Sequence, residues 1–154
     1  MLMTTQLNNK TKKRVSTTDG REFTIKGVVR SDGVELPGWH VSREIHKPGS
    51  EHKSIPVYET SDAPEKIEAS LERTKKITIK VEKDFEDLWN ETYVFSNGLR
   101  WQMIKIPDEG EPFVLVGNLY ESSYFHSPKA LKSKVKLIAD LIALSDSQLI
   151  NKYS

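Results

Sequence analysis

The chain has 154 residues, of which 23 are Lys or Arg and 22 are Asp or Glu, so its formal net charge at pH 7 is +1. Hydrophobic residues make up 36% and charged residues 29% of the chain, a composition typical of one globular domain rather than of a disordered segment. The absence of cysteine excludes disulfides, thiolate catalysis and cysteine-ligated zinc, and it fits a reducing compartment.

The distribution of apolar and charged residues favours a cytoplasmic protein. The longest apolar runs have about four residues, far fewer than the roughly 20 that a membrane-spanning helix needs. The N-terminus lacks the apolar core of a secretory signal. The balanced charge means that nucleic-acid binding would require a local basic patch.

The first third of the chain predicts a tail followed by strands. Residues 1–14 have no periodicity and end in a basic cluster, so we expect a flexible basic tail before a single domain over residues 15–154. Alternation of apolar and polar residues predicts strands over 21–30 and 39–45, with a shorter strand over 34–36. Residues 53–59 predict a return strand, which Pro56 places at a sheet edge.

The pattern changes to a helical period after residue 60. Ile67 and Leu71 lie one helical turn apart, and the spacing predicts a helix over 63–75. Alternation returns over 77–82, which predicts another strand, and residues 84–90 predict a helical turn.

The stretch YVFSNGLRWQMIKI, residues 93–106, predicts a β-hairpin. Asn97-Gly98 lies between two runs of strand-forming residues, and this dipeptide favours a two-residue turn. A two-residue loop places side chains on two faces. One face contains Val94, Leu99, Trp101 and Met103, and the other contains Tyr93, Phe95, Arg100, Gln102 and Ile104.

The C-terminal third predicts a central strand and a long helix. Residues 113–120 carry apolar side chains on both faces, as a central strand does. Ser127-Pro128 is typical of a helix start, and the apolar spacing predicts a helix over 128–144, with a short terminal helix over 147–152. The fold class that follows is α+β: a largely antiparallel, hairpin-built sheet packed by the C-terminal amphipathic helix, with one further helix inserted between strands.

The second hairpin face is the main candidate for a function. Its aromatic, guanidinium and amide groups are typical of protein-binding surfaces, so Tyr93, Phe95, Arg100 and Gln102 are predicted to bind a protein partner. The alternative is that another element covers Phe95 and Ile104 and leaves the two polar residues at the rim. The leading hypothesis is a small non-enzymatic interaction module of the adaptor or inhibitor type, binding through an exposed sheet face or edge.

Two other functions are kept as alternatives. A nucleic-acid-binding protein would use the basic tail and the lysine face of the last helix. Its residues would be Lys12, Lys13, Arg14, Lys129, Lys132 and Lys136. A metal-dependent enzyme, such as a nuclease, would use Glu44, His46 and His52, which a turn at Pro48-Gly49 would bring together. A solvated polar strand face explains the same three residues.

Little else in the sequence indicates catalysis. The chain contains no glycine-rich phosphate loop, no nucleophile elbow and no His-Glu-x-x-His motif. We therefore expect no cofactor, a protein partner and no membrane association, with self-association through a sheet edge left open.

Overall fold

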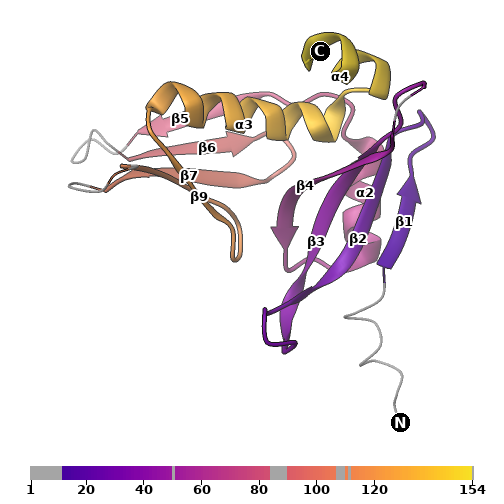
Figure 1. The fold of residues 1–154 in the computed structure, drawn as a ribbon, viewed down its shortest axis with the longest axis horizontal. Helices are drawn as coiled ribbons and strands as arrows, with labels where there is room; N and C mark the ends of the chain where they lie inside the picture. The colour runs from indigo at the N-terminus through magenta and orange to yellow at the C-terminus, as the bar shows by residue number, and fades with distance from the viewer. Residues whose placement is uncertain (1–11, 50, 84–89, 107–109, 111, 154) are drawn as a thin grey trace.

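The computed structural model describes residues 12–49, 51–83, 90–106, 110 and 112–153. It shows an α+β fold with two antiparallel sheets, here named sheet A (order β1-β2-β3-β4) and sheet B (order β5-β6-β7-β8-β9) (Figure 1). The strands are β1 (Lys12–Ser16), β2 (Glu22–Val29), β3 (Glu35–Ile45), β4 (Lys53–Thr60), β5 (Ile79–Lys83), β6 (Glu91–Phe95), β7 (Arg100–Lys105), β8 (Phe113–Val116) and β9 (Ser122–Phe125). The helices are α2 (Pro64–Arg73), α3 (Pro128–Ala143) and α4 (Asp146–Tyr153). The predicted antiparallel α+β fold with a C-terminal helix is confirmed, and the structure adds the division of the strands into two sheets.

The helices form where the sequence predicts them. Ser127 caps α3, because its Oγ accepts a hydrogen bond from the Ala130 N–H at 3.2 Å, and Pro128 follows in the first turn. The apolar stripe of α3 is buried, with Leu131 and Ile142 fully inaccessible. In α2 the two residues spaced one turn apart, Ile67 and Leu71, are each 1% exposed.

The two sheets share one hydrophobic core. In Figure 1, α2 lies behind sheet A, while α3 runs along sheet B and reaches the end of sheet A. Helix α3 contacts β4 of sheet A and both β8 and β9 of sheet B. A single cluster of buried apolar side chains contains residues of both sheets and all three helices.

Two buried arginines of sheet A hold the helices in place. Arg21, just before β2, is inaccessible, and its guanidinium donates to the carbonyl oxygens of Leu71 at 3.0 Å, Thr74 at 2.7 Å and Ile142 at 2.8 Å. These carbonyls lie at the C-terminal ends of α2 and α3, where a helix has acceptors without partners. Arg43 of β3 donates to the Leu141 carbonyl at 2.7 Å, so both arginines join sheet A to α3.

The turn between β8 and β9 makes a second connection between the sheets. The Tyr120 hydroxyl donates to the Pro37 carbonyl at 2.7 Å, and the Tyr120 N–H donates to the Glu59 carboxylate at 3.3 Å. Gly38 has a φ of +106°, and a Cβ there would lie 2.5 Å from the Leu119 Cδ1. Glycine therefore lets β3 continue through Pro37-Gly38, where the sequence predicts an interruption.

The predicted boundary of the N-terminal tail is wrong at its last three residues. Lys12, Lys13 and Arg14 belong to β1, which pairs with β2. The strand is anchored by Val15, which is 7% exposed and lies opposite Phe23. The other residues of the predicted tail, 1–11, lie outside the described residues, as does most of the helical turn predicted over 84–90.

The other strands agree with the sequence with one addition. β4 is an edge strand, as Pro56 predicts, and β8 lies between β7 and β9, as its two apolar faces predict. The predicted strand over 113–120 ends at Val116, and β9 (Ser122–Phe125) was not predicted.

Candidate functional site

The Asn-Gly hairpin has a three-residue loop, one residue longer than the sequence predicts. The Phe95 N–H donates to the Leu99 carbonyl at 2.8 Å, and Gly98 takes a φ of +99°. Tyr93 therefore pairs with Trp101, rather than with the predicted Gln102. A three-residue loop with glycine in the left-handed region is the next most common hairpin connection after the two-residue turn.

This shift of one residue overturns the predicted protein-binding face. Tyr93 and Phe95 are 2% and 1% exposed and face the core beside Trp101. Arg100 and Gln102 are exposed on the opposite face of sheet B, where Arg100 pairs with Glu82. The four predicted residues therefore do not form one surface, because a register shift of one moves alternate side chains to the other face.

The structure brings Glu44, His46 and His52 together. The Nδ1 atoms of the two histidines lie 3.3 Å apart, the His52 Nε2 contacts Glu44, and the His46 Nε2 lies 3.1 Å from Glu22. Both nitrogens of each ring thus face a protein partner. Within the ranges that the structure describes, no group of three or more His, Asp or Glu side chains is arranged to hold a metal ion.

These four side chains form a carboxylate–histidine–histidine–carboxylate chain, in which Glu22, His46, His52 and Glu44 follow one another in contact.

Glu44 is the most buried of these four side chains, and its environment predicts that the stability of the fold decreases in acid. Burial alone raises the pKa of the Glu44 carboxyl, but hydrogen bonds from His52, Thr24 and Ser54 together hold it below its usual value. A lowered folded-state pKa gives stability that is complete above the unfolded-state pKa of about 4.3 and is lost as the pH falls through the folded-state value.

We therefore expect Glu44→Gln to lower the free energy of unfolding at neutral pH and to weaken its decline between about pH 5 and pH 3. Urea denaturation at a series of pH values measures both effects. Glu65→Gln is the matched control, since Glu65 is exposed in the first turn of α2. An unchanged acid decline in Glu44→Gln would contradict the role given to this carboxylate.

The predicted nucleic-acid surface is divided by the fold. β1 is the strand of sheet A farthest from sheet B, whereas the first turns of α3, with Lys129 and Lys132, lie over sheet B (Figure 1). Lys13 is paired with Glu68 and Lys132 with Glu91. The six predicted residues, Lys12, Lys13, Arg14, Lys129, Lys132 and Lys136, do not converge on one patch.

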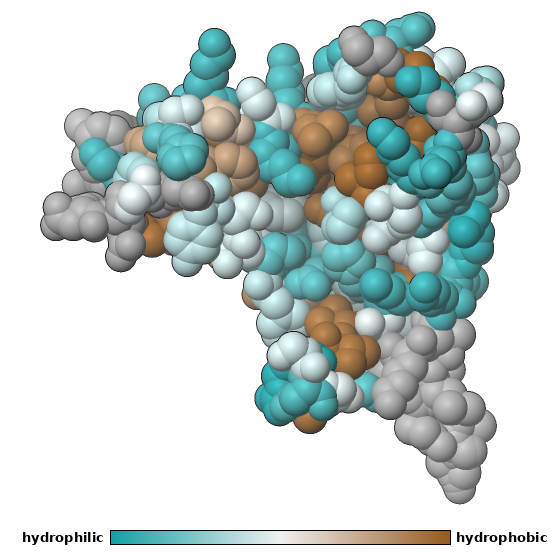
Figure 2. All heavy atoms as spheres, viewed as in Figure 1, coloured by the Kyte–Doolittle hydropathy of each residue, from teal (hydrophilic) through white to brown (hydrophobic). Residues whose placement is uncertain are grey.

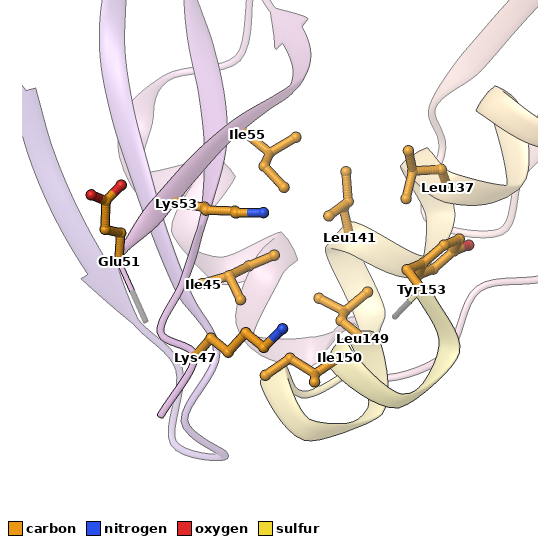
Figure 3. Close-up of a pocket in the computed structure, with 10 residues that line it drawn as sticks. All are labelled: Ile45, Lys47, Glu51, Lys53, Ile55, Leu137, Leu141, Leu149, Ile150 and Tyr153. Atoms are coloured by element: carbon orange, nitrogen blue, oxygen red, sulfur yellow. The ribbon is translucent and has the colours of Figure 1, made fainter. Parts of the chain in front are cut away.

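An apolar pocket lies where the ends of β3 and β4 meet α3 and α4. Its cavity is about 190 Å³, and its walls come from all four elements (Figure 3). The lining residues are Ile45, Lys47, Glu51, Lys53, Ile55, Leu137, Leu141, Leu149, Ile150 and Tyr153. Figure 2 shows hydrophobic side chains gathered on the surface over this junction.

Polar contacts at both ends of α4 fix the wall of this pocket. Asp146, at the start of α4, accepts hydrogen bonds from the Arg43 guanidinium at 2.7 Å and the His46 N–H at 3.2 Å. At the other end, the Tyr153 hydroxyl donates to Asp140 of α3 at 2.5 Å, and Lys152 lies 2.7 Å from the same carboxylate. The pocket is therefore built into the fold before any partner binds.

Two lysines give the pocket a positive rim. In Figure 3 the ammonium groups of Lys47 and Lys53 point toward the cavity, whereas the Glu51 carboxylate points away from it. Both lysines are exposed, and neither forms an ion pair with any residue in the described part of the chain. The site offers an apolar cavity beside two cations that form no ion pair with the residues the structure describes.

The sequence contains only a weak signal for this pocket. Ile45, Leu137 and Leu141 fit the periodicity of ordinary core positions, and the sequence does not place α4 against β3. The available signal was the pair of lysines on either side of the predicted Pro48-Gly49 turn, next to apolar strand positions.

Comparisons with protein-family models, with curated proteins and with solved structures find no match for this chain. None of the helices in the described ranges is long and apolar enough to cross a membrane.

Proposed function

We propose that this chain is a non-enzymatic protein-binding module that seats one large apolar side chain of an acidic partner segment in the pocket between sheet A, α3 and α4. The observation that carries the proposal is the apolar cavity with two lysines at its rim that pair with no described residue. The proposal keeps the interaction function predicted from the sequence and moves its site away from the hairpin. It also keeps the predicted cytoplasmic location as part of the hypothesis.

The size of the cavity favours a side chain over a whole small molecule. Sites for drug-sized ligands usually have volumes of about 300 to 1,000 Å³, whereas this cavity has about 190 Å³. A dry cavity of about 150 Å³ holds a molecule the size of benzene. One phenylalanine or leucine side chain is therefore a fitting occupant, and such buried anchors supply most of the affinity in many interfaces.

The positive charge of the two lysines at the rim favours partner segments with acidic residues beside the anchor side chain. Lys47 follows the end of β3 and Lys53 begins β4, so acidic residues next to the anchor would meet a cation. Rim charges of this kind mainly speed association and select partners. Because α4 is held at both ends, little free energy is lost in ordering the site when the partner binds.

Fluorescence anisotropy of a labelled peptide with one phenylalanine between glutamates tests this proposal. We expect binding that is lost when the phenylalanine is replaced by serine. The double variant Lys47→Glu/Lys53→Glu should raise the Kd by about tenfold or more, because two attractive contacts become repulsive. The matched control, Lys129→Glu/Lys136→Glu, makes the same charge change on exposed positions of α3 that do not line the pocket.

Three results would contradict the proposal. They are no binding of the peptide by the native chain, an equal loss of affinity in the two double variants, and binding of free phenylacetate as tight as that of the peptide. The last result would indicate a small-molecule site. Circular dichroism of each variant separates loss of binding from loss of fold.

A further inference from the structure

The face of sheet A that points away from α2, here named the outer face, is polar, and none of the helices α2, α3 and α4 covers it. In Figure 1, α2 lies behind the strands, and Figure 2 shows mostly hydrophilic side chains over this part of the sheet. Strand pairing arranges the outer face in rows that cross β1, β2 and β3. One row, here named the cationic row, places Lys12 opposite Lys26 and Lys26 opposite His40.

The cationic row is unfavourable for the stability of the sheet. Like charges that lie directly opposite on neighbouring strands repel one another. Neither Lys12 nor Lys26 forms an ion pair with any residue that the structure describes, although Arg14, one row away, lies 3.4 Å from Glu22. An anion bound between the two lysines would offset this repulsion.

The surface around these lysines is hollowed. A cavity of about 330 Å³ contains both lysines at one end, Arg14 and Ser42 along its length, and Glu44 at the other end. A second hollow shares the two lysines and extends past His40 to Glu59, which lies opposite His40 in the same row and 3.4 Å from its ring. The volume of the first lies within the range of small-ligand sites, which is about 300 to 1,000 Å³.

The composition of the hollow favours a small phosphorylated molecule over a nucleic acid. Its lining contains no Phe, Tyr or Trp on which bases could stack, and stacking carries much of the affinity for single strands. The cationic end suits a phosphate, which lysine binds as a point charge. The Ser42 hydroxyl suits a hydroxyl group of a polyol, whereas the Glu44 carboxylate already accepts from His52, Thr24 and Ser54.

We propose that the outer face of sheet A binds a phosphorylated polyol, with its phosphate between Lys12 and Lys26 and its hydroxyl groups toward Ser42. This site is separate from the apolar pocket and does not depend on the protein-binding proposal. It explains why the sheet tolerates two opposed lysines, because the bound phosphate supplies the missing counter-charge.

Amide chemical shifts in ¹H–¹⁵N correlation spectra, followed during titration with glucose 6-phosphate at low salt, test this site on the full chain. We expect the largest chemical-shift changes on residues of β1, β2 and β3. The affinity for glucose 6-phosphate should fall as salt is added, and glucose should not bind. Inorganic phosphate should bind more weakly than glucose 6-phosphate, and equal binding would contradict the polyol contacts.

The variant Lys26→Thr separates a ligand site from an ordinary charged surface. It should raise the Kd for glucose 6-phosphate by about tenfold or more and also raise the Tm of the free protein, because the like-charge opposition is removed. The control is Lys80→Thr, which changes an exposed lysine of β5 and should alter neither quantity. Unchanged affinity in Lys26→Thr, or shifts spread over lysines of both sheets, would overturn the proposal. Lys47→Glu/Lys53→Glu should retain this binding, so the two proposals can fail separately.

Discussion

Replacing Arg21 by methionine is expected to lower the free energy of unfolding by about 3 kcal/mol or more, from roughly 1 kcal/mol for each of three buried carbonyl acceptors that would lose its donor. The guanidinium lies in the core and bonds the carbonyls of Leu71, Thr74 and Ile142. Methionine fills a similar volume without a donor, so the effect measures the lost hydrogen bonds and not a cavity. The corresponding fall in Tm is about 6 °C or more.

Two further substitutions make this test specific. Arg21→Lys retains the positive charge but has one ammonium in place of a planar fork, so it should recover only part of the lost stability. Arg30→Met, the control, removes an exposed arginine that pairs with Asp32, and it should leave the Tm nearly unchanged. Guanidinium denaturation of the variants measures the differences. Equal effects of Arg21→Met and Arg30→Met would show that Arg21 does not connect the two helices to the sheet.

The elements of this fold were predictable because each has its own period. Alternation of apolar and polar residues predicted β2 and β4, and the spacing of apolar residues predicted α2 and α3. Each predicted end lies within two residues of the observed one. Strand β1 was missed because Lys12, Lys13 and Arg14 carry no apolar alternation of their own. Its stability comes from pairing with β2, a non-local contact that a local pattern does not contain.

The division into two sheets and the roles of the arginines could not be predicted. Arg21 and Arg43 read as surface residues, since arginine is rarely buried unless it is paired. Arg21 also pairs with the nearby Asp19 and Arg43 with Asp146. Their other partners are backbone carbonyls at residues 71, 74, 141 and 142, more than 45 positions away in the chain. A sequence shows that an arginine can donate hydrogen bonds. Carbonyl acceptors without a helical partner arise only where the folded helices end against the sheet.

The candidate sites show a similar limit. The sequence correctly brought Glu44, His46 and His52 together at a turn, because a hairpin makes such residues neighbours. It could not show that the ring nitrogens face one another and the two carboxylates of Glu22 and Glu44. The apolar pocket needs α4 to pack against β3, which depends on Asp146 meeting Arg43.

The hairpin gives the second large expected effect and a direct test of its register. Phe95→Ala is expected to lower the free energy of unfolding by about 3 to 5 kcal/mol, the usual cost of removing a buried aromatic ring, because Phe95 is 1% exposed. Arg100→Ala should leave the free energy of unfolding nearly unchanged, since its side chain is exposed on the other face. Urea denaturation of the two variants measures the difference.

The comparison of these two variants distinguishes the registers, because one register places Phe95 and Arg100 on the same face of the sheet and the other places them on opposite faces. With a two-residue loop, Phe95 and Arg100 lie opposite each other on one face, so a binding face would tolerate alanine at both positions. With the observed three-residue loop, Phe95 lies opposite Leu99 and faces the core, while Arg100 lies opposite Val94 on the outside. A small effect of Phe95→Ala would therefore support the two-residue loop. Tyr93 and Phe95 would then lie on the surface and again be candidates for partner binding.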